Sequence, residues 1–347
     1  MVRGSRINGK DCIGMAVPNC EIITDLEWCK RLWAAHREVS MPFGDWGLRS
    51  KGAEVSGVTP YFLRHAETGT VLPLGLSGEM AVFFGGRVYS ERNGFIGPKG
   101  GERELFELLL DSGRTFRLLS WDCDPLALTS SAIKAFEVPY NQFWVADPFK
   151  DMETYSENRL LPKHTKEFRY LQRKFTYTNL DLPGWRECAE RLERYIELTI
   201  QSFSKRNARS VYDDDVARKI IFETCEKVYA QNALKLMEIS YNSTPCGLAV
   251  FVDASGAERA TYLLNLYAPS PSDISNGITC AVIRYACISG KPIDGLRGSF
   301  TLKKKFGFRP EPAFALVRDP NWIVKPQSDL SPSETLSLYG RHFGSER

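Results

Sequence analysis

The sequence has no run of about 18 apolar residues, the length that a helix needs to cross a bilayer. Its first ten residues are polar and basic, and they lack the apolar middle region of a signal peptide. We therefore expect a cytoplasmic protein without a membrane span. The net charge is only +3, so any site for an anion has to come from local clustering of basic residues.

Paired cysteines are also missing. The nine cysteines are an odd number, none stands in a CxxC pair, and the four histidines lie far apart along the chain. This spacing argues against a disulfide framework, and we predict no metal site. We expect most of the cysteines to be small core residues.

Three common catalytic signatures are absent: the Gly-x-Ser-x-Gly elbow, the Walker loop and the dinucleotide fingerprint. Their absence removes the main sequence support for a hydrolase, an NTPase or a dehydrogenase. The chain has 347 residues, of which 43% are hydrophobic and 25% are charged. This length and composition are typical of a globular protein with two domains.

The two halves of the chain share one order of elements: a hairpin, a third strand, a helix and a short strand that ends near an aspartate. In the first half we expect these elements at 61–64 and 71–74, 81–84, 102–110, and 116–121 before Asp122. In the second half we expect them at 234–239 and 247–252, 260–267, 278–289, and 292–296 with Asp294. This order predicts an α/β (α+β) fold in which two similar modules pack side by side, with a cleft between them.

A motif follows the last of these short strands. A glycine, a large apolar residue, a lysine, an aromatic residue and a second glycine stand at Gly298, Leu302, Lys303, Phe306 and Gly307. With this spacing the segment resembles the C-terminal half of Fem-type (FemAB-like) transferases, which belong to the wider GNAT acyltransferase superfamily. Within that group it is most similar to the Fem-like proteins of exported-polysaccharide gene clusters.

The resemblance implies two tandem GNAT-like modules, each with a mixed, mostly antiparallel sheet flanked by helices. On this basis we expect a loose N-terminal lead-in at 1–20, an N-terminal module at 21–150, connecting helices at 151–230, a C-terminal module at 231–325 and a tail at 326–347.

The resemblance also implies an N-acyltransferase. Such an enzyme would move an acyl or aminoacyl group from an activated donor to a small-molecule amine, in a cell-surface precursor or a specialised metabolite. The donor would be a co-substrate, either aminoacyl-tRNA, with tRNA as a partner, or an acyl thioester such as acyl-CoA, and no tightly bound cofactor is expected. The alternative is a non-catalytic GNAT-fold protein that binds an anionic glycan or RNA, with an affinity that falls steeply as salt rises. The oligomeric state stays open.

Lys303 matches the family lysine near the donor ester, and its ammonium could stabilise the oxyanion that forms during acyl transfer. Leu302 replaces the usual aromatic residue before it, and Phe306 follows on the expected donor side. Lys304 and Lys305 point elsewhere if the segment is helical, so they either meet donor phosphates or are solvated. The other interpretation of the three lysines is a solvated basic loop.

Asp122 and Asp294 are the candidate general bases, because strand ends line clefts in α/β modules. Either one could instead cap a turn, and acyl transfer can also proceed with the substrate handling the proton.

Two segments are candidate anion sites. Lys166, Arg169 and Arg173 share one face of an expected helix at 163–175, where they could bind phosphates or form a solvated face. Ser275, Asn276 and Gly277 precede another helix as a reduced version of the pyrophosphate loop of acetyl-CoA enzymes, or as a simple cap. Because the full loop is absent, the sequence favours aminoacyl-tRNA or another carrier-bound donor.

Three aromatic residues on expected strands are open to two interpretations. Trp121, Tyr262 and Tyr267 could line an acceptor pocket, or they could be core residues.

Overall fold

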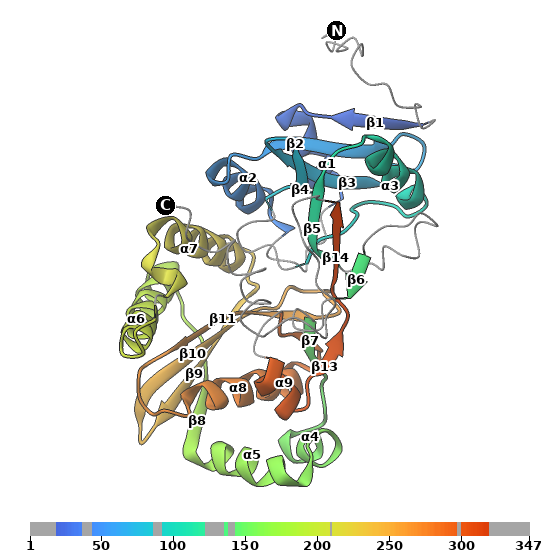
Figure 1. Cartoon of the computed structure of the whole chain (residues 1–347). Coiled ribbons are helices and arrows are strands. Elements are labelled where there is room, and N and C mark those ends of the chain that lie inside the picture. The colour runs from blue at the N-terminus through green and yellow to red at the C-terminus, as the bar shows by residue number, and fades with distance from the viewer. Residues whose placement is uncertain are drawn as a thin grey trace.

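The computed structural model describes residues 19–36, 44–85, 92–121, 135–137, 143–208, 210–296 and 300–318. Within these residues the chain forms two seven-stranded sheets, one above the other in Figure 1, with helices on their faces. The expected α/β class with two mixed, mostly antiparallel sheets is confirmed. No helix in this part of the chain is long and apolar enough to cross a membrane.

The first sheet has the order β1-β2-β3-β4-β5-β14-β6, and only β4 and β5 run parallel. Its strands are β1 (Cys20–Ile23), β2 (Thr59–His65), β3 (Val71–Ser77), β4 (Met80–Phe83), β5 (Phe116–Trp121), β6 (Ala135–Glu137) and β14 (Phe314–Arg318). The helices beside it are α1 (Leu26–Ala35), α2 (Trp46–Val55) and α3 (Glu102–Asp111). α3 packs because Leu105, Phe106 and Leu109 lie on one helical face and are fully buried against the sheet.

The second sheet has the order β13-β7-β12-β11-β10-β9-β8, and only β11 and β12 run parallel. Its strands are β7 (Phe143–Ala146), β8 (Phe175–Leu180), β9 (Leu234–Tyr241), β10 (Thr244–Val252), β11 (Ala260–Tyr267), β12 (Ile293–Asp294) and β13 (Arg309–Glu311). Asn242 and Ser243 join β9 to β10 with φ angles of 49° and 61°. These angles belong to the tight hairpin turn that the sequence predicts here.

Helices cover both faces of the second sheet. They are α4 (Met152–Arg159), α5 (Pro162–Lys174), α6 (Trp185–Ser204), α7 (Asp215–Ala230), α8 (Ile274–Ser289) and the short α9 (Phe300–Lys305). α5 and α8 pack with one core cluster of the sheet, and α6 and α7 pack with the other. α8 is apolar on almost every side and ends at Gly290, whose φ is 67°.

The two sheets exchange a strand in each direction. β7 precedes the connecting helices, yet it pairs with β12 and β13 of the second sheet. β14 follows the last helix, yet it pairs with β5 and β6 of the first sheet, and Figure 1 shows it running upward between the sheets. The sequence-based domain limits stay predictions, and the exchange places one strand of each expected module in the other module's sheet.

Each sheet also contains the repeated unit that the sequence predicts. A strand, a helix and a short parallel strand follow one another as β4-α3-β5 and as β11-α8-β12. In the second unit the parallel pairing covers only Ala260 with Ile293 and Thr261 with Asp294. β11 continues for six residues beyond that pairing, and this overhang forms one wall of the candidate site.

Candidate functional site

A pocket of about 350 Å³ opens where β11 extends past β12. This volume is in the range of small-molecule sites. We call it the β11 pocket, and we define it by its lining residues: Tyr262, Leu263, Asn265, Tyr267, Ser275, Ile278, Thr279, Val282, Gly295, Leu296, Leu302, Lys303 and Phe308.

One wall of the β11 pocket comes from α8. Ser275, Ile278, Thr279 and Val282 line it because the spacing i, i+3, i+4 and i+7 brings them to one helical face. Tyr262 of β11 also lines the pocket and is half-buried, and burial of its hydroxyl near two other tyrosines holds the phenol pKa well above its usual value. The phenol is therefore neutral at ordinary pH and able to donate a hydrogen bond.

Lys303 lies in the wall of this pocket, and its side chain is buried. Its ammonium donates hydrogen bonds to the backbone carbonyl of Gly295 at 2.6 Å and to that of Leu296 at 3.2 Å. The sequence motif therefore brings a lysine to the pocket that lies between β11, α8 and α9. The pocket also contains Leu302, the residue that replaces the family aromatic.

The loop that holds Lys303 has an unusual backbone. Leu296 is buried and has a φ of 57°, a left-handed conformation that costs energy for any residue with a Cβ. Its carbonyl also accepts a hydrogen bond from the Trp144 amide, so the surrounding contacts hold the strained conformation. Strain of this kind concentrates at functional sites. Here the carbonyl groups of Gly295 and Leu296 both point toward the Lys303 ammonium.

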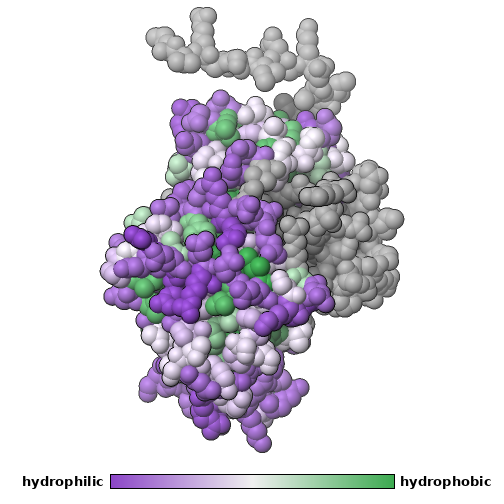
Figure 2. Space-filling view, turned by 90° about the vertical axis from the view of Figure 1, so that its left-hand side faces the viewer, coloured by the Kyte–Doolittle hydropathy of each residue, from purple (hydrophilic) through white to green (hydrophobic). Residues whose placement is uncertain are grey.

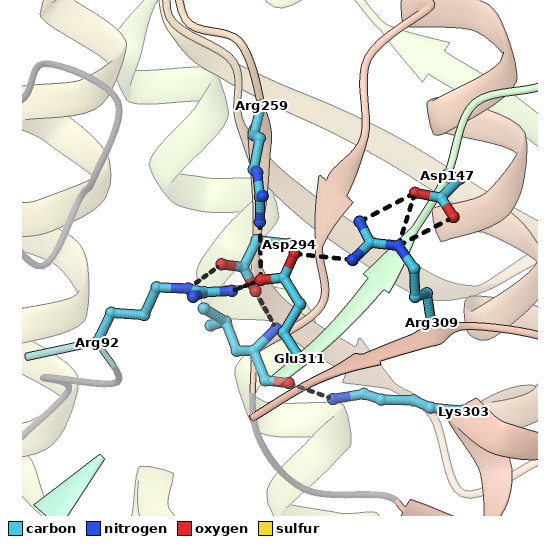
Figure 3. A network of polar contacts seen from close by, with 8 residues as sticks. Arg92, Asp147, Arg259, Asp294, Lys303, Arg309 and Glu311 are labelled. Atoms are coloured by element: carbon cyan, nitrogen blue, oxygen red, sulfur yellow. Dashed lines mark hydrogen bonds and ion pairs between the residues drawn. The ribbon is translucent and has the colours of Figure 1, made fainter. Parts of the chain in front are cut away.

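Asp294 fixes this loop and connects it to the N-terminal half of the chain. One carboxylate oxygen accepts the Leu296 amide at 2.9 Å, and the other accepts the guanidinium of Arg92. Figure 3 shows Arg92 reaching both Asp294 and Glu311. The general-base role of Asp294 stays a prediction, but both oxygens are engaged and the residue does not line the pocket, so the geometry favours a positioning role.

Glu311 is the centre of the ion-pair network in Figure 3. Arg92, Arg259 and Arg309 bind its carboxylate at 2.8, 2.9 and 3.1 Å, and Arg309 also contacts Asp147. Burial raises the pKa of Glu311, but the guanidiniums of Arg259 and Arg92 lower it more, to about 2.

This shift predicts a loss of stability in acid. Because the folded pKa is about 2 and the ordinary pKa of a glutamate is 4.5, the stabilisation is complete above about pH 4.5 and disappears as the pH falls toward 2. Its full size is about 3 kcal/mol. We expect Glu311→Gln to lower the free energy of unfolding near neutral pH, and the gap to wild type to narrow as the pH falls below about 4.5. Denaturant unfolding across this range measures the gap, and a constant gap would contradict the pairing.

The segment Ser275, Asn276 and Gly277 lies inside the first turn of α8 rather than before it. The amides of Asn276 and Gly277 already donate to the Asp273 carbonyl, at 3.0 and 3.1 Å. The Asp273 carboxylate stands at the same end and pairs with Lys174 at 2.8 Å. A carboxylate at a helix N-terminus disfavours a second anion there, so the geometry argues against a phosphate loop at this segment, and its donor-binding role stays a prediction.

The three residues of that segment have separate roles instead. Ser275 lines the β11 pocket, and Asn276 donates to Glu167 at 3.1 Å. Gly277 is buried against Phe175, where an added Cβ would approach the ring to 2.9 Å. Gly277 is therefore a packing residue.

The other expected donor contacts also lie away from the pocket. Lys305 pairs with Glu167 at 2.5 Å, and Lys304 is exposed on the outer side of α9. Phe306 is fully buried in the core beside Phe168, and the Tyr155 hydroxyl donates to its carbonyl at 2.8 Å. The Phe306 ring packs in the core and does not line the pocket, so this packing argues against its donor-side role, which stays a prediction.

Lys166, Arg169 and Arg173 share the exposed face of α5, as the spacing predicts. Arg169 pairs with Glu153 of α4, and none of the three lines the β11 pocket. Their role in anion binding stays a prediction.

Asp122 and Gly298 lie outside the described residues. Trp121 is fully buried in the first sheet's core, whereas Tyr262 and Tyr267 line the pocket. Among the described residues, no group of three or more His, Cys, Asp or Glu side chains is arranged to hold a metal ion.

No protein-family model and no curated protein matches the chain. Several solved structures superpose on it. L-PGS from Bacillus licheniformis superposes with a TM-score of 0.55 and 10% identity, over 93% of this chain and 98% of that one. The C-terminal DUF2156 domain of a protein from Agrobacterium fabrum, provisionally named lysylphosphatidylglycerol synthetase, has a TM-score of 0.54 and 10% identity, over 90% and 96%.

FemX has a TM-score of 0.52 and 10% identity, over 86% of this chain and 97% of that one. At this level of identity the likeness shows the fold alone. The likeness to FemX confirms the expected Fem-like fold, and the association with polysaccharide gene clusters stays a prediction.

Proposed function

We propose that this protein is an N-acyltransferase that forms an amide in the β11 pocket. The observation that carries the proposal is the Lys303 ammonium in the pocket wall, held by the carbonyls of a strained loop. A fixed cation in a partly enclosed site stabilises developing negative charge more strongly than the same cation in water.

In the proposed reaction a neutral amine attacks the carbonyl carbon of an ester or thioester. The new C–N bond forms, the carbonyl oxygen gains negative charge beside Lys303, and the C–O or C–S bond to the carrier then breaks. The amine proton passes to the departing oxygen or sulfur, so that the acceptor leaves as an amide and the carrier as an alcohol or thiol. The neutral phenol of Tyr262 is placed to donate a hydrogen bond within the same pocket.

The donor is proposed to be aminoacyl-tRNA or an acyl thioester, and the acceptor an amine of a cell-surface precursor or a specialised metabolite. Aminoacyl transfer is supported by the name of one structural neighbour, lysylphosphatidylglycerol synthetase, which describes the joining of a lysyl group to phosphatidylglycerol. The N-terminus of α8 supports aminoacyl transfer further. Acetyl-CoA enzymes bind a pyrophosphate at such a helix end, whereas here the Asp273 carboxylate lies beside it.

The test uses the full-length protein with a mixture of aminoacyl-tRNAs, or with a panel of acyl-CoA thioesters, and with amine acceptors of both classes. We expect mass spectrometry to detect an amide product with one donor class. Tight binding of tRNA or a glycan without product from any donor would support the non-catalytic alternative instead.

A further inference from the structure

Arg206 lies just beyond the end of α6, beside the end of β11. α6 is held against that end because the Tyr267 amide donates to the Thr199 hydroxyl at 2.8 Å. Tyr267 lines the β11 pocket, and its own hydroxyl accepts a hydrogen bond from Arg206 at 3.0 Å. Arg206 is exposed and does not line the pocket itself, so it is next to the pocket through its contact with Tyr267.

The guanidinium of Arg206 is held in one orientation by neutral groups. It donates to the Ser202 carbonyl at 3.1 Å and to the Ser202 hydroxyl at 3.3 Å. It also lies over the rings of Phe203 and Tyr267, at 4.8 and 5.8 Å from their centroids. Ordering a long side chain in advance reduces the entropy lost when a ligand binds.

The positive charge of Arg206 has no carboxylate beside it. In the part of the chain that the structure describes, no Asp or Glu lies within ion-pair distance of this residue, and its neighbour Lys205 adds a second exposed cation. Nearby arginines on α6 and α7 differ, since Arg191 pairs with Glu238 at 3.0 Å and Arg218 pairs with Glu197 at 2.6 Å. An ordered guanidinium without a counter-ion is a site prepared for an external anion.

We propose that Arg206 forms a phosphate subsite that binds the nucleotide carrier of the acyl donor at the mouth of the β11 pocket. The identity of the ligand rests on the proposed function, because aminoacyl-tRNA and acyl-CoA both carry phosphates on a nucleotide. A planar guanidinium can bind two phosphate oxygens at once. Of the two other candidate anion sites, the N-terminus of α8 already has Asp273 beside it, and Lys166, Arg169 and Arg173 of α5 do not line the pocket.

The surface around α6 suits this ligand. Figure 2 views the molecule from the side on which α6 and α7 lie in Figure 1, and there hydrophilic residues surround small, separate apolar patches. This face offers charge and hydrogen bonds rather than a broad apolar surface. A phosphate-bearing carrier matches that chemistry better than an apolar partner does.

The test compares Arg206→Gln and Arg206→Lys with wild type. The matched control is Arg186→Gln, at the other end of the same helix, where the Arg186 side chain is 91% exposed. Dissociation constants are measured for two probes, CoA and uncharged tRNA, at several salt concentrations. Where the wild type turns over a donor, kcat and the donor KM are measured as well.

We expect Arg206→Gln to weaken binding of one probe about tenfold, since a hydrogen bond to a charged group contributes about that factor. If the probe is tRNA, its log affinity should also fall less steeply with log salt, with a slope that is shallower by about one. Arg206→Lys should recover only part of the loss, because a point charge replaces a two-pronged donor. The donor KM should rise with kcat at saturation within about twofold, as for a lost binding contact.

The probe whose affinity falls in Arg206→Gln identifies the carrier. Unchanged affinity and salt dependence for both probes would overturn the phosphate subsite, as would an Arg186→Gln control that lost as much affinity as Arg206→Gln. These outcomes are separate from the proposed function. If wild type binds a probe through Arg206 but forms no amide with any donor, the acyltransferase proposal fails and the phosphate subsite stands.

Discussion

Replacing Lys303 with methionine is expected to lower kcat by about 10²- to 10³-fold, the usual effect of removing one group that stabilises an oxyanion. Methionine keeps the apolar stem of the side chain and removes only the charge. The donor KM should change much less, because the ammonium acts on charge that develops in the transition state. Steady-state kinetics with the donor identified for wild type measure both values.

The same substitution should also affect folding, and this effect has to be separated. Without the ammonium, the Gly295 carbonyl loses its hydrogen bond from Lys303, whereas the Leu296 carbonyl keeps the one from the Trp144 amide. The loss at Gly295 costs about 1–3 kcal/mol. Kinetics should therefore be measured well below the melting temperature, with Lys219→Met as the control at an exposed, loosely paired lysine of α7. If the folded Lys303→Met protein kept turnover within about twofold of wild type, Lys303 would be structural only.

Replacing Arg92 with alanine is expected to lower the free energy of unfolding by about 3–5 kcal/mol, because it leaves the buried Asp294 carboxylate without its cation and removes one of the three arginines that bind Glu311. The side chains of Arg92 and Asp294 are 11% and 3% exposed, so water cannot take over the contact. Arg92 also lies over the ring of Phe143 at 4.0 Å, and this contact is lost as well.

A double-mutant cycle with Asp294→Asn isolates the pair. We expect the two substitutions together to cost clearly less than the sum of the single costs, because each one alone leaves the other group buried and unpaired. Chemical denaturation measures all four proteins, and Arg103→Ala, which breaks an exposed pair with Glu107, is the control. Costs that simply add would show that the two residues do not stabilise one another.

The parts of this site that can be predicted from sequence are those encoded by local spacing. Lys303 stands in a motif of ten residues, although its role in the site stays a prediction. α5 has a periodic pattern with a proline at its first position, so the helix expected at 163–175 lies close to the observed one. The repeated order of strand, helix and short strand also depends on local periodicity, and it placed β11 and α8 correctly as elements.

The contacts that hold the candidate site together are long-range, and local sequence pattern carries no signal for them. Arg92 and Asp294 are 202 residues apart, and Lys305 and Glu167 are 138 apart. The left-handed backbone at Leu296 could not be foreseen, because leucine has no preference for it. The exchange of β7 and β14 escaped prediction for a similar reason, since short apolar strands do not indicate which sheet they join.

Other misplacements arose at element boundaries. α8 begins at Ile274, so Ser275, Asn276 and Gly277 fell inside a helix that was expected to follow them. Phe306 stood at the motif position expected on the donor side, yet its ring packs in the core. Local sequence pattern does not single out Arg206, because its significance depends on Tyr267, which is 61 residues away in the chain.

Blocking the β11 pocket tests most directly whether the reaction takes place there. Asn265 lines the pocket from an exposed strand position, where tryptophan is well tolerated, so Asn265→Trp should fill the opening without disturbing the core. Ile288→Trp places the same side chain at an exposed position near the end of α8, away from the pocket. We predict that the rate of amide formation by Asn265→Trp falls at least about 100-fold, while Ile288→Trp keeps the wild-type rate. Both variants should have the melting temperature of wild type. Equal rates of amide formation in the two variants would contradict the placement of the reaction in this pocket.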